Sequence, residues 1–192
     1  MFVDYLTLML VNLAAGLVIT AVFVFFFLNG ERKRAAPGFL VSGFVALVTG
    51  FHEIFTWPIP GSYNIPFGEG SILFGILLFA AGIAVLKDWD LLTLGVYAVF
   101  AGVASIILGF RIYNLKMTNE PLVSAAGFIL TGLIAVVSLP AYLLRKSLVV
   151  RIIAALALLG AAAIWGVFGY LAYWAHLDNF SKWLPPTMAA PK

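Results

Sequence analysis

Six apolar runs with few or no charges are the strongest constraint on the fold, because each is close to the roughly 20 residues that a helix needs to cross a bilayer. Most of the charged residues lie in the short segments between these runs. The strands of a membrane barrel would alternate apolar and polar residues, and these runs do not. The sequence therefore predicts an all-α polytopic membrane bundle. It would be a single transmembrane domain over residues 1–192, with spans at about 5–28, 38–57, 70–86, 91–113, 122–144 and 148–175.

The composition agrees with a chain that is surrounded by lipid. Hydrophobic residues make up 64% of the sequence and charged residues 10%, against about 45–50% and about 25% in soluble domains. We therefore expect a cell-membrane protein whose first partner is the bilayer. The first run should stay in the mature protein, because no Lys or Arg precedes it as in a signal peptide. The absence of cysteine excludes disulfides and thiolate metal sites.

The basic residues predict an orientation. Seven of the 11 Lys and Arg residues follow the first, third and fifth runs, and the other four are Arg111, Lys116, Lys182 and Lys192. The positive-inside rule then places both termini outside the cell. The net charge of +3 comes mainly from short connections that meet lipid headgroups, so nucleic-acid binding is not expected.

The ends of the second and fourth runs resemble each other at an offset of 59 residues. The stretches "GFVALVTGFHEIF" and "GVASIILGFRIYN" match at Gly43 and Gly102, Gly50 and Gly109, and Phe51 and Phe110. Runs two and three would then form a helical hairpin that is duplicated, in parallel, by runs four and five. The alternative is that glycine recurs because small residues let membrane helices approach closely.

The last two turns of the second run carry a polar face, made of Thr49, His52, Glu53 and Thr56. Ionisable groups within a span usually face the bundle interior or an aqueous cavity and have a partner there. We expect Arg111, at the end of the fourth run, and Glu69, at the start of the third, to join Glu53 in a network. One alternative is that these residues form an ion-pair cluster with a purely structural role. Another is that their charged side-chain ends reach out of the span to water.

Residues 58–68 connect the second and third runs and are too apolar for a flexible linker. Pro58 cannot continue the preceding helix. We expect this segment to cover the helix ends as a lid, with Tyr63 and Asn64 supplying hydrogen bonds. The predicted ligand-binding residues are His52, Glu53, Glu69, Arg111, Tyr63 and Asn64.

Four stretches carry a resemblance, namely "DYLTLMLVNLAAGL", "TWPIPGSYNIPFGEGSILFG", "KDWDLLTLGVYAVFAG" and "NEPLVSAAGFILTG". They resemble a family of small multi-pass membrane proteins of bacteria and archaea whose function is unknown. The resemblance runs from the first span into the fifth, and the Trp-Pro-x-Pro-Gly-Ser-Tyr-Asn stretch is its specific part. It implies a fold and no activity.

Three functions fit these observations. The first is binding or handling of a small polar solute, cation or proton at the polar network under the 58–68 segment. The second is an accessory or scaffold subunit of a larger membrane complex, such as a respiratory one, with other membrane subunits or further copies of the chain as partners. The third is a haem or metal site that uses His52 and His176.

Motifs of enzymes are not found: the sequence has no P-loop, no GxSxG and no HExxH. We therefore favour a role without catalysis and assign no cofactor. An acid–base reaction at His52 and Glu53 stays open.

Overall fold

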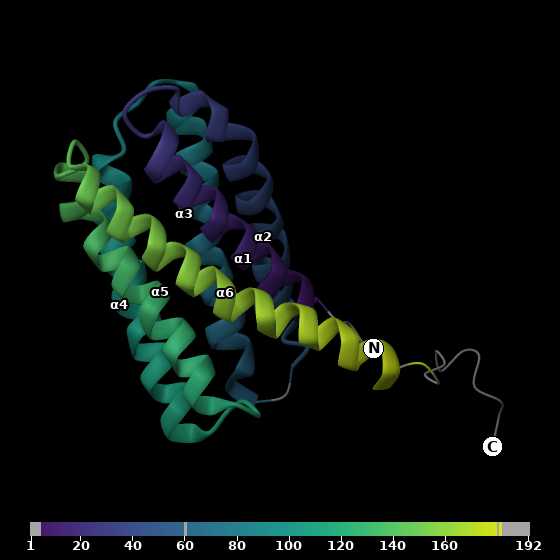
Figure 1. Cartoon of the computed structure of the whole chain (residues 1–192). Coiled ribbons are helices and arrows are strands. Elements are labelled where there is room, and N and C mark those ends of the chain that lie inside the picture. Colours follow the sequence, from purple (N-terminus) through teal and green to yellow (C-terminus); the bar gives the residue numbers. More distant parts are fainter. Residues whose placement is uncertain (1–4, 60, 180, 182–192) are drawn as a thin grey trace, which may run out of the picture.

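The structure is a computed structural model that describes residues 5–59, 61–179 and 181, and these form a bundle of six long helices (Figure 1). The helices are α1 (Leu6–Val22), α2 (Ala36–Thr56), α3 (Gly70–Leu86), α4 (Leu92–Leu115), α5 (Pro121–Leu143) and α6 (Leu148–Asn179). Within this described part, six helical segments are long and apolar enough to cross a membrane. The predicted all-α membrane bundle is confirmed.

Short helical turns extend or precede three of these helices. The π-helical turn η1 (Phe23–Phe27) continues α1, and the 3-10 turn η2 (Arg32–Ala35) leads into α2. Between α2 and α3 lie a 3-10 turn, η3 (Gly61–Tyr63), and a π-helical turn, η4 (Ile65–Glu69), which runs directly into α3. The third membrane helix therefore begins before residue 70, where the sequence predicts its start.

The helix boundaries follow from local backbone chemistry. Prolines stand in the first turns of α2 and α5, where a missing N–H costs nothing. The residues that follow α2 and α4, Trp57 and Lys116, both adopt the left-handed conformation, with φ of 45° and 50°. Such a residue ends a helix because the next N–H turns back toward the last carbonyls. Pro58 then prevents α2 from resuming.

Because the chain runs up and down, its connections gather at two ends (Figure 1). We call the end with Tyr5, the α2–α3 and α4–α5 connections and the end of α6 the terminal end. The opposite end, the basic end, holds the α1–α2, α3–α4 and α5–α6 connections with seven of the Lys and Arg residues. Lys182 and Lys192, which enter the predicted orientation, lie outside the described residues. Which end faces outside stays a prediction.

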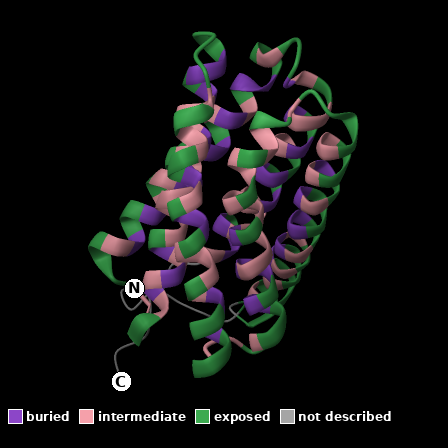
Figure 2. Cartoon of the chain, turned by 90° about the vertical axis from the view of Figure 1, so that its left-hand side faces the viewer, coloured by how far each residue is buried: buried purple, intermediate pink, exposed green. Residues whose placement is uncertain are grey.

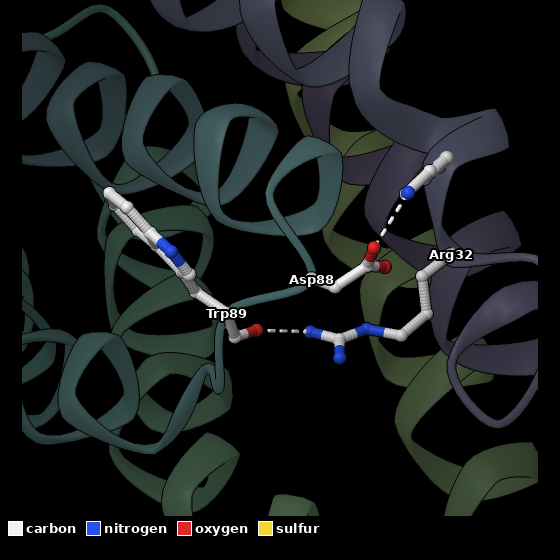
Figure 3. A network of polar contacts seen from close by, with 4 residues as sticks. Arg32, Asp88 and Trp89 are labelled. Carbon is white, nitrogen blue, oxygen red and sulfur yellow. Dashed lines mark hydrogen bonds and ion pairs between the residues drawn. The ribbon is translucent and has the colours of Figure 1, made fainter.

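At the basic end, polar contacts fasten the α3–α4 connection to the start of α2 (Figure 3). The Arg32 guanidinium donates a hydrogen bond of 2.8 Å from Nη2 to the Trp89 carbonyl. Beside it, Lys33 Nζ lies 2.6 Å from Asp88 Oδ2. Both side chains of this ion pair are largely exposed, so the pair contributes mainly to the position of the connection.

Each helix has one dominant neighbour: α2 pairs with α3, α4 with α5, and α1 with α6. Buried and exposed residues alternate along each helix, so each has an inward face (Figure 2). One core cluster joins α1, α4, α5 and α6 and includes Leu17, Phe128 and Trp165. A second cluster joins α1, α2 and α3 at the basic end around Phe39 and Val85.

The hairpins α2–α3 and α4–α5 share close contacts at equivalent glycines. A Cβ atom built on Gly50 would lie 2.9 Å from Ile72 Cγ1, and one built on Gly109 would lie 2.7 Å from Ile129 Cγ1. In each pair the glycine lets the two helices approach at the same point of the hairpin.

Glycines on the second helix of each hairpin repeat this equivalence. A Cβ on Gly75 would lie 2.9 Å from the Leu47 amide nitrogen, and one on Gly132 would lie 3.0 Å from the Ile106 amide nitrogen. The first helices therefore correspond at an offset of 59 residues (106 − 47 = 59) and the second helices at 57 (132 − 75 = 57). The connection of the second hairpin is thus two residues shorter. This recurrence of specific contacts goes beyond a general abundance of glycine and supports the duplicated hairpin.

Candidate functional site

Glu53, in the last turn of α2, is the most unusual side chain at the terminal end. It is 0% exposed. Neither of its carboxyl oxygens has a hydrogen-bond partner among the residues that the structure describes. Burying an ionised carboxylate without a partner is very costly, and buried charges are normally paired or bound to a metal. Packing alone therefore does not account for a glutamate at this position.

The backbone of η4 covers Glu53. A Cβ atom built on Gly68 would lie 3.3 Å from Glu53 Cβ and 3.4 Å from Glu53 Cγ, and 2.9 Å from Ile54 Cγ1. Glycine is therefore the residue that lets η4 lie this close to α2. Pro66 and Gly68 are both buried, so η4 is part of the packed bundle.

Tyr5, the residue before α1, is the buried neighbour of Glu53. It is 8% exposed, and its hydroxyl has no hydrogen-bond partner in the described part of the chain. Burial and, to a smaller extent, the charge of an ionised Glu53 raise the pKa of the Tyr5 phenol to about 12. The phenol therefore keeps its proton at neutral pH and remains a hydrogen-bond donor.

Two histidines on different helices contact the beginning of the first helix, one at Tyr5 and one at Thr7. The exposed His52 on α2 packs its ring edge-on against Tyr5, with the ring centroids 5.4 Å apart and the planes at 90°. His176 on α6 is half-buried, and its Nδ1 lies 3.2 Å from Thr7 Oγ1. The ends of α1, α2 and α6 thus meet through Tyr5, His52, Thr7 and His176.

The expected ion-pair network of Glu53, Glu69 and Arg111 does not form. Glu69 and Arg111 are exposed, and the ion pairs of the described chain are Lys33–Asp88 and Arg34–Glu31. The reason is the arrangement of the helices. Arg111 lies on α4, whose main neighbour is α5 and not α2, so its end can reach the surface at no cost.

Asn64 and Tyr63 lie in the segment between α2 and η4. Asn64 is 0% exposed, and its side chain forms hydrogen bonds within that segment. Its Oδ1 accepts a hydrogen bond of 3.1 Å from the Ile59 N–H, and its Nδ2 donates one of 2.5 Å to the Ile59 carbonyl. Tyr63 is half-buried. The predicted lid is thus a turn fastened by Asn64, followed by a helical segment, η4.

A metal centre of acidic and histidine ligands has no support in the arrangement. No group of three or more His, Cys, Asp or Glu side chains in the described ranges could hold a metal ion. His52 and His176, the suggested haem ligands, contact Tyr5 and Thr7 respectively. The site residue that sequence reasoning missed is Tyr5, since a tyrosine at the edge of a span is typical of the interfacial aromatic belt.

A separate cavity of about 100 Å³ lies between the helices nearer the middle of the bundle, lined mainly by apolar side chains. Two polar side chains of its wall, Asn12 and Ser105, form hydrogen bonds to the backbone of neighbouring helices. Asn12 Nδ2 donates 2.9 Å to the Ser42 carbonyl, and Ser105 Oγ donates 2.8 Å to the Phe128 carbonyl. The cavity wall does not include Glu53.

Residues 1–179 match a family described as protein of unknown function, DUF981, and the chain therefore belongs to that family. The match covers all six helices. The chain has no match among the curated proteins or the solved structures.

Proposed function

We propose that this member of the DUF981 family binds a proton or a small cation at Glu53, beneath η4 at the terminal end of the bundle. The observation that carries the proposal is a fully buried carboxyl with two unpartnered oxygens in an integral membrane protein. Ionisable groups inside a membrane bundle are costly and mark ion and proton pathways. A proton or a cation removes that cost by neutralising the carboxylate.

The surroundings of Glu53 support a small occupant. Tyr5 provides a phenol that stays protonated at neutral pH. His52 lies at the exposed side of Tyr5, where exchange with water can begin. Tyr5 stands just before α1 and is close enough for the charge of Glu53 to act on its phenol, and His52 is the residue next to Glu53 on α2. Such surroundings suit a proton or a single ion.

Thermal unfolding of the purified protein in nanodiscs tests the proposal, with Na⁺, K⁺, Mg²⁺, Ca²⁺ and pH varied one at a time. A ligand that binds only the folded state at about 100 times its Kd adds roughly 2.7 kcal/mol. For a chain of this size that is a shift in Tm of roughly 5–10 °C. We expect one of these variables to shift the wild type and not Glu53→Gln.

The matched control is Glu69→Gln, which neutralises the exposed carboxyl of η4. It should respond as the wild type does. If the wild type and Glu53→Gln respond identically to every ion and to pH, Glu53 binds neither and the proposal is wrong.

A further inference from the structure

Glu53 and Ile112 occupy equivalent places in the two hairpins. The offset of the first helices places residue 53 at residue 112 (53 + 59 = 112). Each lies four residues before a left-handed cap, Trp57 in one hairpin and Lys116 in the other. Ile112 is 1% exposed and Glu53 0%.

The facing backbone is equivalent as well. A Cβ on Gly50 would lie 2.9 Å from the Gly68 carbonyl oxygen, and one on Gly109 would lie 3.0 Å from the Ala125 carbonyl oxygen. Gly68 and Ala125 differ by the offset of the second helices (125 − 68 = 57). One slot of the repeated hairpin therefore holds an isoleucine in one copy and a glutamate in the other.

This comparison limits what the Glu53 slot can bind. In the second hairpin, the isoleucine side chain alone fills the equivalent slot, so the slot has room for one side chain and little else. In the first hairpin, Gly68 packs closely over the Cβ and Cγ of Glu53. A cation would need several oxygen ligands around it, and the described acidic and histidine side chains do not gather into a set of three. A proton needs no space.

From this geometry we infer that the species bound at Glu53 is a proton, so that the side chain is a neutral carboxylic acid in the folded bundle. The inference rests on the proposed function and narrows it to one ligand. The reaction is a reversible protonation: a carboxylate oxygen takes a proton from water, and no other bond changes. The titratable groups around Glu53 are Tyr5 before α1, His52 on α2 itself and Glu69 on η4, with His176 of α6 bonded to Thr7.

A protonated Glu53 links stability to pH in a defined direction. The folded state would hold one proton that the unfolded chain releases near the ordinary glutamate range, so stability should fall as the pH rises. Glu53→Gln keeps the shape of the neutral acid and should remove this dependence. Glu53→Ile places the residue of the equivalent slot there and should do the same, with a Tm at high pH above that of the wild type.

Infrared difference spectroscopy and thermal unfolding test the inference on the full chain in nanodiscs between about pH 5 and pH 9. The wild type should show the carbonyl stretch of a protonated carboxyl at the acidic end and lose it at the alkaline end. Glu53→Gln should lack that band, and Glu69→Gln should retain it. Glu53→Gln keeps the test valid even if Glu53→Ile fails to fold.

Two results would overturn the inference, and they differ in what they imply for the proposed function. If Na⁺, K⁺, Mg²⁺ or Ca²⁺ raises the Tm of the wild type but not of Glu53→Gln, and no protonated-carboxyl band is found, the ligand is that cation. The proposed function then stands and the proton is excluded. If neither the band nor any Tm response depends on Glu53, both fail.

Discussion

Gly102 on α4 and Gly132 on α5 face each other across the tightest contact of the second hairpin. A Cβ atom built on Gly102 would lie 2.5 Å from the Gly132 carbonyl oxygen, and one built on Gly132 would lie 2.6 Å from the Gly102 carbonyl oxygen. Both obstacles are backbone atoms, which cannot move without the helix. The separation of α4 and α5 is thus set by the absence of two side chains.

Gly132→Ala should therefore destabilise the bundle by about 1–3 kcal/mol, the usual cost of overpacking. Gly160→Ala on α6 is the control, because a Cβ there meets nothing within 4 Å. It should be neutral or stabilise by roughly 0.5–1 kcal/mol, since alanine is the better helix former. Unfolding in mixed micelles measures both, and equal stabilities of the two variants would contradict the packing account.

Asp90, in the α3–α4 connection, should make the basic end sensitive to acid. Its Oδ1 accepts a hydrogen bond of 2.7 Å from the Leu92 N–H and its Oδ2 one of 3.0 Å from the Tyr142 hydroxyl. These two bonds hold the pKa of Asp90 below its usual range. A lowered pKa means that the folded state binds the proton less tightly, so the stabilisation is present above the unfolded value of about 3.9 and is lost as the pH falls through the folded value.

Thermal unfolding of the wild type and Asp90→Asn from about pH 6 to pH 3 isolates this contribution. The advantage of the wild type should shrink toward the acidic end. Tyr142→Phe removes one of the two hydrogen bonds to Asp90, so its stability should depend less on pH over this range than that of the wild type. A difference between wild type and Asp90→Asn that is constant over this range would refute the assignment.

Thr131 on α5 should contribute to stability through Trp165 on α6. The indole Nε1 donates a hydrogen bond of 3.0 Å to Thr131 Oγ1, and Trp165 is 3% exposed. Thr131→Val keeps the shape and leaves the indole N–H without its acceptor, which should cost about 1 kcal/mol. The exposed Thr93→Val on α4 is the matched control, expected within about 0.5 kcal/mol of the wild type. A double-mutant cycle with Trp165→Phe should assign the loss to this pair.

Asn64→Ala should loosen the segment between α2 and η4. The asparagine supplies both bonds to Ile59, so its loss leaves two backbone groups unpaired, at roughly 1–3 kcal/mol for each one that stays buried. Limited proteolysis should cut the variant within residues 57–69 faster than the wild type. Ser62→Ala, at an exposed position of the same segment, should be cut at the wild-type rate.

The helices could be predicted from the sequence because a segment that crosses lipid must be apolar and long enough to span it, and both properties can be read from the local sequence. The end of α3 and the start of α6 agree with the predicted runs to the residue, since the charges just beyond them leave little choice. The helical character of residues 65–69 was missed, because Pro66 suggests a loop until its place in the first turn of a helix is seen.

The candidate site was less accessible to sequence reasoning. Glu53 was predicted to bind, but its neighbours depend on which helices pair. The sequence suggests Arg111 as the partner of Glu53. In the structure, the residue near Glu53 is Tyr5, just before the first helix, and α4, which carries Arg111, packs mainly against α5. The two buried residues at equivalent places, Glu53 and Ile112, could be matched only after the contacts had fixed the offset of the hairpins.

The pairing of α1 with α6 has a consequence for how the chain is made. Arg151 Nη1 donates a hydrogen bond of 2.9 Å to the Phe25 carbonyl, and Asn29 Nδ2 donates one of 2.8 Å to the Arg145 carbonyl. The last helix and the connection before it therefore complete the end of the first. At the usual pace of translation, α6 leaves the ribosome on the order of ten seconds after α1. During that interval the first helix is without its main neighbour, and the face that α6 later covers stays open to other contacts.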